Sequence, residues 1–249
     1  MMYEPRFYRT SFNTERFHGF TIGYKETDLW IGIDPDSYSS ALTNYAEERI
    51  RYYRNQLEQY LLIDPEYGKS LVPVPVRSSA PPIAREMAKA AERAGVGPMA
   101  AVAGAFSEWI GTDILANFKV NELVIENGGD IFLVVKKDLV FSVYAGNSPF
   151  SGKIGITIPA SDTPLGVCTS AGTVGPSLSF GKTDATMLVC KNTALADAWA
   201  TSLGNRVIQP DDIEPVLNLT EKIPEILSCI IVCKDKVGIR GNYELKLIR

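Results

Sequence analysis

The sequence predicts an α+β fold in which helices pack on antiparallel sheets. Stretches of β-forming residues come in neighbouring pairs, and helical patterns are grouped between them without regular strand–helix–strand alternation. The clearest pair of strands is joined across Asn127-Gly128-Gly129, because these residues tolerate the positive φ of a tight turn.

The predicted elements follow from hydrophobic periodicity and from Gly and Pro breaks. In the first part of the chain they are strands over 7–12, 17–25 and 29–34 and helices over 37–64, 83–94 and 98–111. In the rest they are strands over 122–127, 130–135, 139–144, 153–159, 165–169, 183–190, 226–234 and 243–248 and helices over 192–205 and 211–219. We expect Asp36 or Ser37 to cap the first helix. In the helix before last, Asn192 or Thr193 should be the N-cap and Gly204 the stop.

The bulk composition is that of a soluble globular protein. Its 249 residues are 45% hydrophobic and 22% charged, with a formal net charge of −4. No Lys/Arg run suggests nucleic acid, no apolar run reaches the ~18 residues of a membrane-spanning helix, and the first ten residues do not resemble a secretion signal. We therefore expect a cytoplasmic protein that binds neither nucleic acid nor membrane. No linker separates independent domains, so residues 1–249 should form one domain, with sub-halves near 1–135 and 136–249.

Cysteine and histidine spacing argues against two classes of site. The four cysteines form no Cys-x-x-Cys pair, and the single histidine, His18, lies far from them in sequence. This spacing disfavours a zinc site and a Ser-His-Asp triad. Cys229 and Cys233 share one face of an apolar run and are expected to be buried, reduced thiols.

Two segments are expected to pack unusually closely. The stretch 64–82 contains VPVPV, which cannot donate a full ladder of hydrogen bonds, so we predict an extended crossing or edge segment; a lid over a site is the alternative. The helix over 98–111 is apolar nearly all round and rich in Ala and Gly. It should be buried against a sheet or another backbone, or against a bound ligand.

The helix over 192–205 carries the candidate metal ligands. Asp197 and Thr201 are four residues apart and therefore share one face, one turn apart. A carboxylate and a hydroxyl in this arrangement can both reach one hard cation, with phosphate oxygens and water completing its shell. The alternative is an Asp favoured near the helix N-terminus and a Thr bonded back to its own backbone.

Two glycine-rich turns are candidate ligand contacts. The amides of Gly128 and Gly129, with Asp130, either form a simple hairpin or line a ligand site. The later turn, Thr169-Ser170-Ala171-Gly172, has exposed amides and small hydroxyls, the composition of a loop that cradles an anion.

Three stretches, in order, resemble the ApbE superfamily of FAD:protein FMN transferases. They are GPMAAVAGAFSEWIG, ELVIENGGDIF, and ALADAWATSL preceded by CTSAG, and together they span residues 97–204. The resemblance implies two fused T-fold-like halves, each with helices against antiparallel strands. It also implies Mg²⁺ held by Asp197 and Thr201 where the pyrophosphate of a flavin dinucleotide would lie, with Asp130 and the 169–172 turn lining the same cleft.

The chain departs from the family pattern at positions that would contact flavin. Val96 stands where the family has Lys, Ala101 stands where it has a flavin-binding Asp, and its His-Ile-x-Asp-Pro segment is absent. We therefore identify a divergent ApbE-like subfamily and expect FAD or FMN to bind weakly or not at all, because Ala101 cannot accept a hydrogen bond.

Two functions remain open from the sequence. The first is a Mg²⁺-dependent transferase that acts on a phosphate-bearing cofactor, for which no catalytic residue is assigned. The second is a non-catalytic protein that binds such a small ligand in support of cofactor or sulfur metabolism. A homodimer is also expected, from the family and because exposed strand edges need cover.

Overall fold

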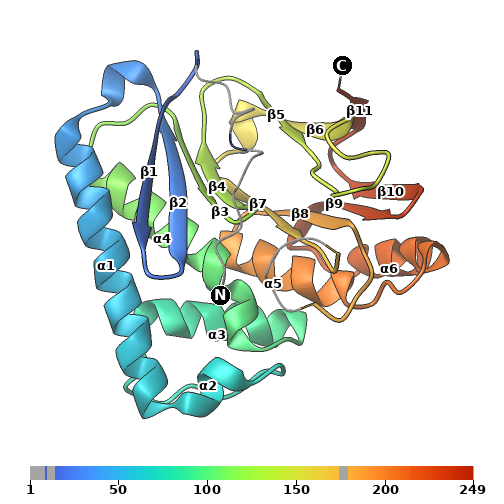
Figure 1. Ribbon diagram of the computed structural model, residues 1–249, viewed down its shortest axis with the longest axis horizontal. Helices are drawn as coiled ribbons and strands as arrows, with labels where there is room; N and C mark the ends of the chain where they lie inside the picture. The colour runs from blue at the N-terminus through green and yellow to red at the C-terminus, as the bar shows by residue number, and fades with distance from the viewer. Residues whose placement is uncertain (1–8, 10–14, 174–178, 249) are drawn as a thin grey trace.

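A central eight-stranded antiparallel sheet carries helices on one face and a smaller sheet on the other (Figure 1). The computed structural model describes residues 9, 15–173 and 179–248. The large sheet has the order β1 (His18–Tyr24), β2 (Thr27–Ile33), β3 (Leu123–Asn127), β4 (Asp130–Val134), β7 (Leu165–Ser170), β8 (Ala185–Cys190), β9 (Ile226–Cys233) and β10 (Lys236–Gly241). The small sheet has the order β11 (Leu245–Leu247), β6 (Ile154–Ile158) and β5 (Leu139–Ser142).

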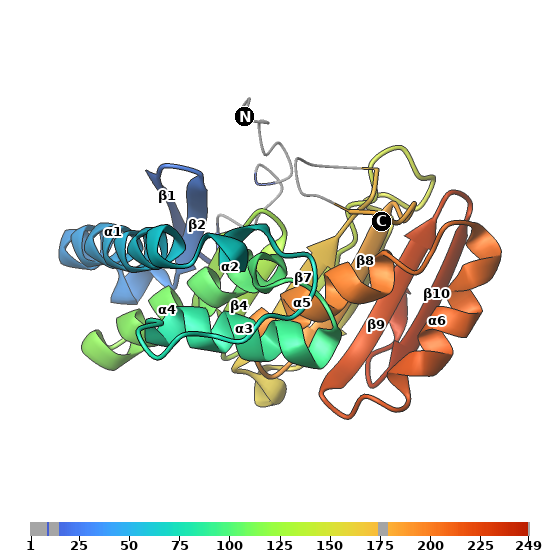
Figure 2. The ribbon, with the colours of Figure 1, turned by 90° about the horizontal axis from the view of Figure 1, so that it is seen from below.

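The helices lie together on one side of the large sheet, and Figure 2 shows them in front of its strands. The α-helices are α1 (Ser40–Ile63), α2 (Pro65–Lys69), α3 (Pro82–Ala94), α4 (Val102–Asn117), α5 (Thr193–Gly204) and α6 (Ile213–Thr220). The 3-10 turns are η2 (Pro35–Ser37), η3 (Pro98–Ala101), η4 (Ala160–Asp162) and η5 (Pro210–Asp212).

The order of elements repeats along the chain. In the first half, the hairpin β1–β2 is followed by helices and then by the hairpin β3–β4; in the second half, β7–β8 is followed by helices and then by β9–β10. The two groups of four strands join edge to edge where β4 pairs with β7, with Asp130 opposite Cys168. The predicted α+β class, with helices packed on antiparallel sheets, is therefore confirmed.

Two cores form because strands of the large sheet are buried on both faces. Along β8, Leu188 and Cys190 pack against the helices, whereas Met187 and Val189 pack toward the small sheet. A strand covered on both sides needs no polar alternation, which explains why every residue of β8 is buried. The two cysteines of β9, Cys229 and Cys233, are free and buried on the helix side, as expected.

Several boundaries differ from the sequence prediction. The long helix begins after Ser39, whose hydroxyl accepts a hydrogen bond from the Leu42 amide at 3.3 Å, because Asp36 and Ser37 form the preceding 3-10 turn instead. The helix predicted from Pro98 begins as η3 and continues as α4 to Asn117. The strand predicted over 7–12 lies outside the described residues except for Arg9.

The sequence prediction missed α2, β10 and the separation of the small sheet. In β10, Gly238 interrupts the apolar pattern; its missing Cβ would lie 2.6 Å from Leu217 Cδ1, so α6 packs directly on its backbone. The small sheet covers the face of the large sheet that lies opposite the helices. None of the helices in the described part combines the length and apolar character needed to cross a bilayer.

Candidate functional site

The candidate site is built where α4 crosses α5. At Gly104 of α4, an added Cβ would lie 2.4 Å from the carbonyl oxygen of Thr193 and 2.9 Å from Cβ of Asp197. Only glycine allows this approach, because any side chain would force the two helix backbones apart. The small-residue helix is therefore buried against another backbone, which was one of the two alternatives drawn from its composition.

Asp197 projects from α5 onto the N-terminus of α4. Its Oδ2 accepts a hydrogen bond from the Gly104 amide at 2.9 Å, and the Ala103 amide also donates to the carboxylate. These amides belong to the first turn of α4, where no partner exists within the helix. Asp197 thus caps a neighbouring helix, and its negative charge lies at the positive end of that helix.

Glu108 makes the reciprocal contact from α4 to α5. Its Oε2 accepts a hydrogen bond from the Thr193 amide at 2.6 Å, and the Ala194 amide donates to the same carboxylate. Asn192 completes this helix start as the N-cap, with its Oδ1 accepting from the Leu195 amide at 2.8 Å. Each of the two crossed helices therefore supplies a carboxylate that caps the other.

The glycine hairpin lies at one end of this crossing. Gly128 and Gly129 have φ values of 68° and 103°, so they form the expected tight turn between β3 and β4. The fully buried Glu126 binds the turn through its carboxylate. Its Oε1 accepts a hydrogen bond from the Gly129 amide at 2.8 Å, and its Oε2 accepts one from Arg9 Nε at 2.6 Å.

The structure brings the hairpin and Asp197 together through β7. The Thr169 amide donates to the Gly129 carbonyl at 3.1 Å, and Asp130 pairs with Cys168. Burial, followed by the charges of Asp130 and Asp197, raises the pKa of the Cys168 thiol well above its ordinary value. Both carboxylates therefore lie within electrostatic reach of one buried thiol at the base of the site.

The turn Thr169–Gly172 leads from β7 toward the C-terminal end of α5. Thr169, Ser170 and Ala171 are half-buried and Gly172 is exposed, and the Gly172 amide donates to the Thr183 carbonyl at 2.8 Å. The missing Cβ of Gly172 would lie 2.2 Å from the Gly181 carbonyl oxygen.

Gly181 in turn packs its backbone against the last residue of α5. Its own missing Cβ would lie 2.0 Å from the Gly204 carbonyl oxygen. Thr201, which is half-buried, lies one turn beyond Asp197 toward this end of α5.

Gly204 was expected to stop α5 but is its last residue, and it is not among the glycines with a positive φ. The C-cap is Asn205, which has a φ of −64°. The reason for glycine here is crowding: an added Cβ would lie 3.1 Å from Oγ1 of Thr186 and 3.5 Å from Oγ1 of Thr183. Within the described part of the chain, these two buried hydroxyls have no hydrogen-bond partner.

Comparison with known proteins gives the family. A family model described as AbpE bacteria matches residues 9–220, most of the chain. The chain belongs to this family.

Two relatives and a solved structure are similar to this chain. The UPF0280 protein of Methanocaldococcus jannaschii is 42% identical over 223 residues, and the match covers 88% of each chain. The UPF0280 protein of Methanosphaerula palustris is 46% identical over 184 residues, and the match covers 74% of this chain and 75% of that protein. The apo crystal structure of flavinyl transferase ApbE from Pseudomonas stutzeri matches with a TM-score of 0.56 at 12% identity, covering 91% of this chain and 94% of that one, and therefore shares the fold. The predicted resemblance to a divergent ApbE-like family is confirmed.

Sequence reasoning missed three polar residues at this AbpE-family site. Glu108 is the single charged residue in the stretch GPMAAVAGAFSEWIG, and this isolation could have singled out its half-buried carboxylate. Glu126 precedes the Gly-Gly turn within an apolar strand. Ser107 donates to the Asp130 carbonyl at 2.9 Å, and nothing in its sequence context indicated this contact.

The close approach at Gly104 gives a stability prediction. Gly104→Ala should lower the free energy of unfolding by roughly 2 kcal/mol or more, because the new Cβ overlaps the Thr193 carbonyl. Helix propensity alone would make the Ala variant more stable by about 1 kcal/mol. A loss of stability would therefore show that the close contact between α4 and α5 outweighs helix propensity. The matched control is Gly68→Ala in α2, where the new Cβ meets only the end of the flexible Leu61 side chain. Urea denaturation measures both; equal stability of Gly104→Ala and wild type would contradict the contact.

Burial of Asp197 gives a pH prediction. Burial raises the pKa of Asp197 to about 7, although the amides of Gly104 and Ala103 oppose the shift. The folded state thus keeps a proton that the unfolded chain releases near pH 4, so stability falls as pH rises from about 4 to about 7.

Asp197→Asn keeps the amide-accepting oxygen and removes this ionisation. In metal-free buffer, the variant should match wild type near pH 4 and be more stable by a few kcal/mol above pH 7, at roughly 1.4 kcal/mol per pKa unit. Urea denaturation across this range tests it, and a difference that does not change with pH would refute it.

Proposed function

We propose that this protein binds a phosphate-bearing small molecule between the glycine hairpin, the 169–172 turn and α5, together with Mg²⁺ held by Asp197 and Thr201. The observation that carries the proposal is a set of contacts: Asp130 pairs with Cys168, next to Thr169 of the half-buried 169–172 turn, and its carbonyl accepts a hydrogen bond from Ser107 of α4, the helix whose first turn Asp197 caps. The amides of Thr169 and Gly172 bind carbonyls within the protein, so the hydroxyls of Thr169 and Ser170 are the groups of this turn that would serve phosphate oxygens. The Pseudomonas stutzeri protein that shares this fold is a flavinyl transferase, so a flavin-bearing cofactor is the ligand class that this comparison supports.

The side chains at α5 suit a hard cation. A carboxylate and a hydroxyl are oxygen donors of the kind that Mg²⁺ prefers, and protein sites for Mg²⁺ use few side chains, with water and phosphate completing the shell. Among the described residues there is no cluster of three or more His, Cys, Asp or Glu able to hold a metal, so the ligand and water would supply the remaining bonds.

The surroundings of Asp197 also favour a cation. It is 9% exposed, and none of the ion pairs between described side chains includes it. A buried carboxylate without a cationic side chain is stabilised when a metal ion binds beside it. Bound Mg²⁺ would neutralise phosphate charge and polarise a phosphoryl oxygen.

Binding without covalent catalysis is the form of this function that the geometry favours. The Cys168 thiol is fully buried and its pKa is raised, which suppresses the thiolate needed for nucleophilic attack. At the position of the family's flavin-binding Asp, Ala101 is fully buried and offers no acceptor. The favoured form of the proposal is therefore a ligand-binding accessory role in cofactor or sulfur metabolism, and a Mg²⁺-dependent transferase is the second candidate.

Metal binding tests the role of Asp197. Mn²⁺, used as a paramagnetic probe for the Mg²⁺ site, should bind wild type, and Asp197→Asn should weaken it by at least about tenfold, or 1.4 kcal/mol, while keeping the cap on α4. The control is Asp211→Asn, because Asp211 is exposed and paired with Lys236 away from this site. Electron paramagnetic resonance titration reports free Mn²⁺; equal affinities in wild type and Asp197→Asn would leave Asp197 with a structural role only.

Ligand titrations test the phosphate and flavin parts separately. ADP serves as a probe for the pyrophosphate, and calorimetry should show that it binds in a Mg²⁺-dependent manner. FAD should bind no more than about tenfold more tightly than ADP, a difference of about 1.4 kcal/mol, because Ala101 gives the flavin ring no acceptor. Tight FAD binding with weak ADP binding would show that flavin recognition is retained. No binding of either would remove the phosphate proposal.

A further inference from the structure

A hollow with charged walls lies between α3 and α4, where the segment 70–81, which has no regular secondary structure, enters α3. Its volume is about 560 Å³, which is in the range of small-molecule sites. None of its lining residues belongs to the site proposed between the glycine hairpin and α5. The lining residues are Ala80, Pro82, Arg85, Glu86, Lys89 and Trp109.

Two cationic side chains of the hollow have no acidic partner. Arg85 and Lys89 are four residues apart on α3, so they lie on one face of the helix, one turn apart. Both are exposed, and none of the ion pairs between described side chains includes either of them. Like charges at this spacing repel each other, and an anion bound between them would relieve the repulsion.

The guanidinium of Arg85 is held in place by the backbone. Its Nε donates to the Ala80 carbonyl at 2.8 Å, and its Nη2 donates to the Ser78 carbonyl at 2.5 Å. These bonds leave further N–H groups of the planar guanidinium for an anion. Because the side chain is already positioned, it loses little conformational freedom when it binds a phosphate or a carboxylate.

Trp109 gives the hollow an aromatic surface. Its indole is half-buried and contacts Tyr53 in an edge-to-face arrangement, with ring centroids 5.5 Å apart and an interplanar angle of 77°. Among the described Lys and Arg side chains, none lies over the Trp109 ring. The indole is therefore a surface on which a flat ring of a ligand can pack, beside the exposed Pro82.

Glu86 is the one acidic side chain of the hollow. Its Oε1 accepts a hydrogen bond from Asn192 Nδ2 at 2.9 Å, so the carboxylate is bonded to the residue that caps α5 and not to Arg85 or Lys89. One carboxylate against two cations leaves the hollow with a net positive charge. The carboxylate also suits an N–H group on the ring of a ligand.

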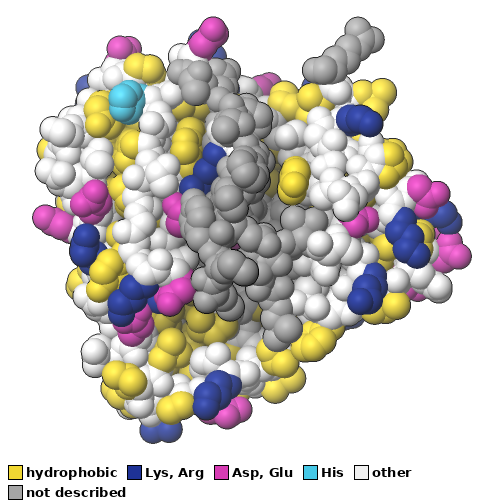
Figure 3. All heavy atoms as spheres, viewed as in Figure 1, with side chains coloured by type: hydrophobic (Ala, Val, Ile, Leu, Met, Phe, Trp, Pro, Cys, Tyr) yellow, Lys and Arg dark blue, Asp and Glu magenta, His cyan; other side chains and the backbone are white. Residues whose placement is uncertain are grey.

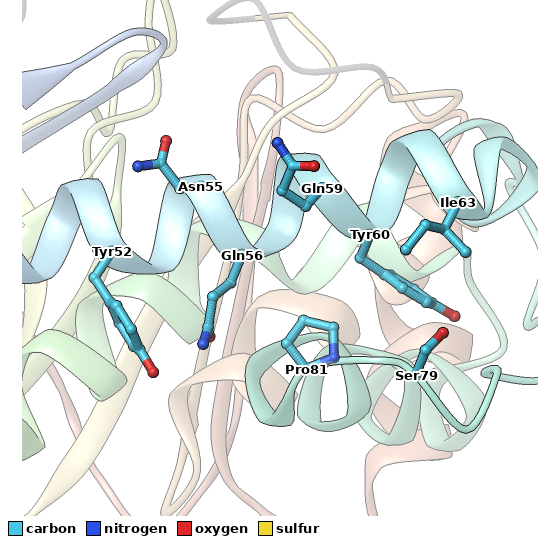
Figure 4. Close-up of a pocket in the computed structure, with 8 residues that line it drawn as sticks. All are labelled: Tyr52, Asn55, Gln56, Gln59, Tyr60, Ile63, Ser79 and Pro81. Carbon is cyan, nitrogen blue, oxygen red and sulfur yellow. The ribbon is translucent and has the colours of Figure 1, made fainter.

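The positive charge is specific to this hollow. The neighbouring groove in Figure 4 has a volume of about 380 Å³ and no charged residue, and Gln56 projects from α1 on the side where Pro81 lies. Figure 3 shows acidic and basic side chains interspersed over one face of the molecule, and the whole chain has a net charge of −4. Attraction of an anion would therefore come from the hollow and not from the overall field of the protein.

We propose that the hollow between α3 and Trp109 binds a small ligand in which a flat ring carries a phosphate or a carboxylate. The anionic group lies between Arg85 and Lys89, and the ring packs on Trp109. Phosphate and carboxylate present similar oxygen acceptors to these two cations, so the geometry defines the chemistry that they share. Binding here needs no metal, which separates this site from the Mg²⁺ site proposed at Asp197.

Calorimetry of the full chain in EDTA tests this site in the absence of Mg²⁺. The probes are AMP, which carries a phosphate, and indole-3-acetate, which carries a carboxylate. At least one should bind with a dissociation constant below about 1 mM, and the tighter one identifies the anionic group. Arg85→Gln and Lys89→Gln should each weaken that probe by about threefold or more, because each removes one charge. Lys119→Gln is the matched control, because Lys119 is an exposed cation outside the hollow and its loss should leave the affinity unchanged.

Anions without a ring test the contact with Trp109. Ribose 5-phosphate and acetate should bind about fivefold or more weakly than AMP and indole-3-acetate, respectively. Trp109→Leu should remove this preference, and circular dichroism melting checks that the variant is folded; if it is not, the comparison in wild type decides. Binding of neither probe at about 5 mM, unchanged affinity in both cation variants, or no preference for the ring would overturn the proposal.

Discussion

The crossing of α4 and α5 at Gly104 is the contact on which the site depends. Two helix N-termini meet there, and each would bury amides without partners if the other helix supplied none. Asp197 binds the first turn of α4 and Glu108 binds the first turn of α5, so the two carboxylates fix both the distance and the register of the helices. Because the backbones touch at Gly104, neither helix can shift without losing a buried hydrogen bond.

This crossing also places the candidate ligands of α5 against the sheet. Gly166 of β7 packs on Thr193, with its missing Cβ 2.5 Å from Thr193 Cα, and Gly204 packs on the Thr186 hydroxyl of β8, so α5 lies along both strands. The pairing of β4 with β7 then joins the glycine hairpin to the 169–172 turn. One carboxylate, Asp197, thus caps α4, and under the proposed function it would also bind a cation together with Thr201 on the same helix face.

Sequence reasoning predicted what depends on neighbouring residues. The turn at Gly128–Gly129 and the N-cap at Asn192 follow from local backbone chemistry, and both occur as expected. The bond from Thr193 to Glu108 joins residues 85 positions apart, so no local pattern specifies it. The small sheet was missed as a separate layer for the same reason, because β5 and β6 look locally like any other strands, and their place depends on packing across the sheet face.

Anomalous X-ray diffraction from crystals soaked in Mn²⁺ tests the central claim most directly. The account predicts one strong peak at coordination distance from the Asp197 carboxylate and the Thr201 hydroxyl, with the bond from the Gly104 amide retained. Absence of a peak at that position, with Asp197 bound only by the amides of α4, would contradict it and leave the carboxylate with a structural role.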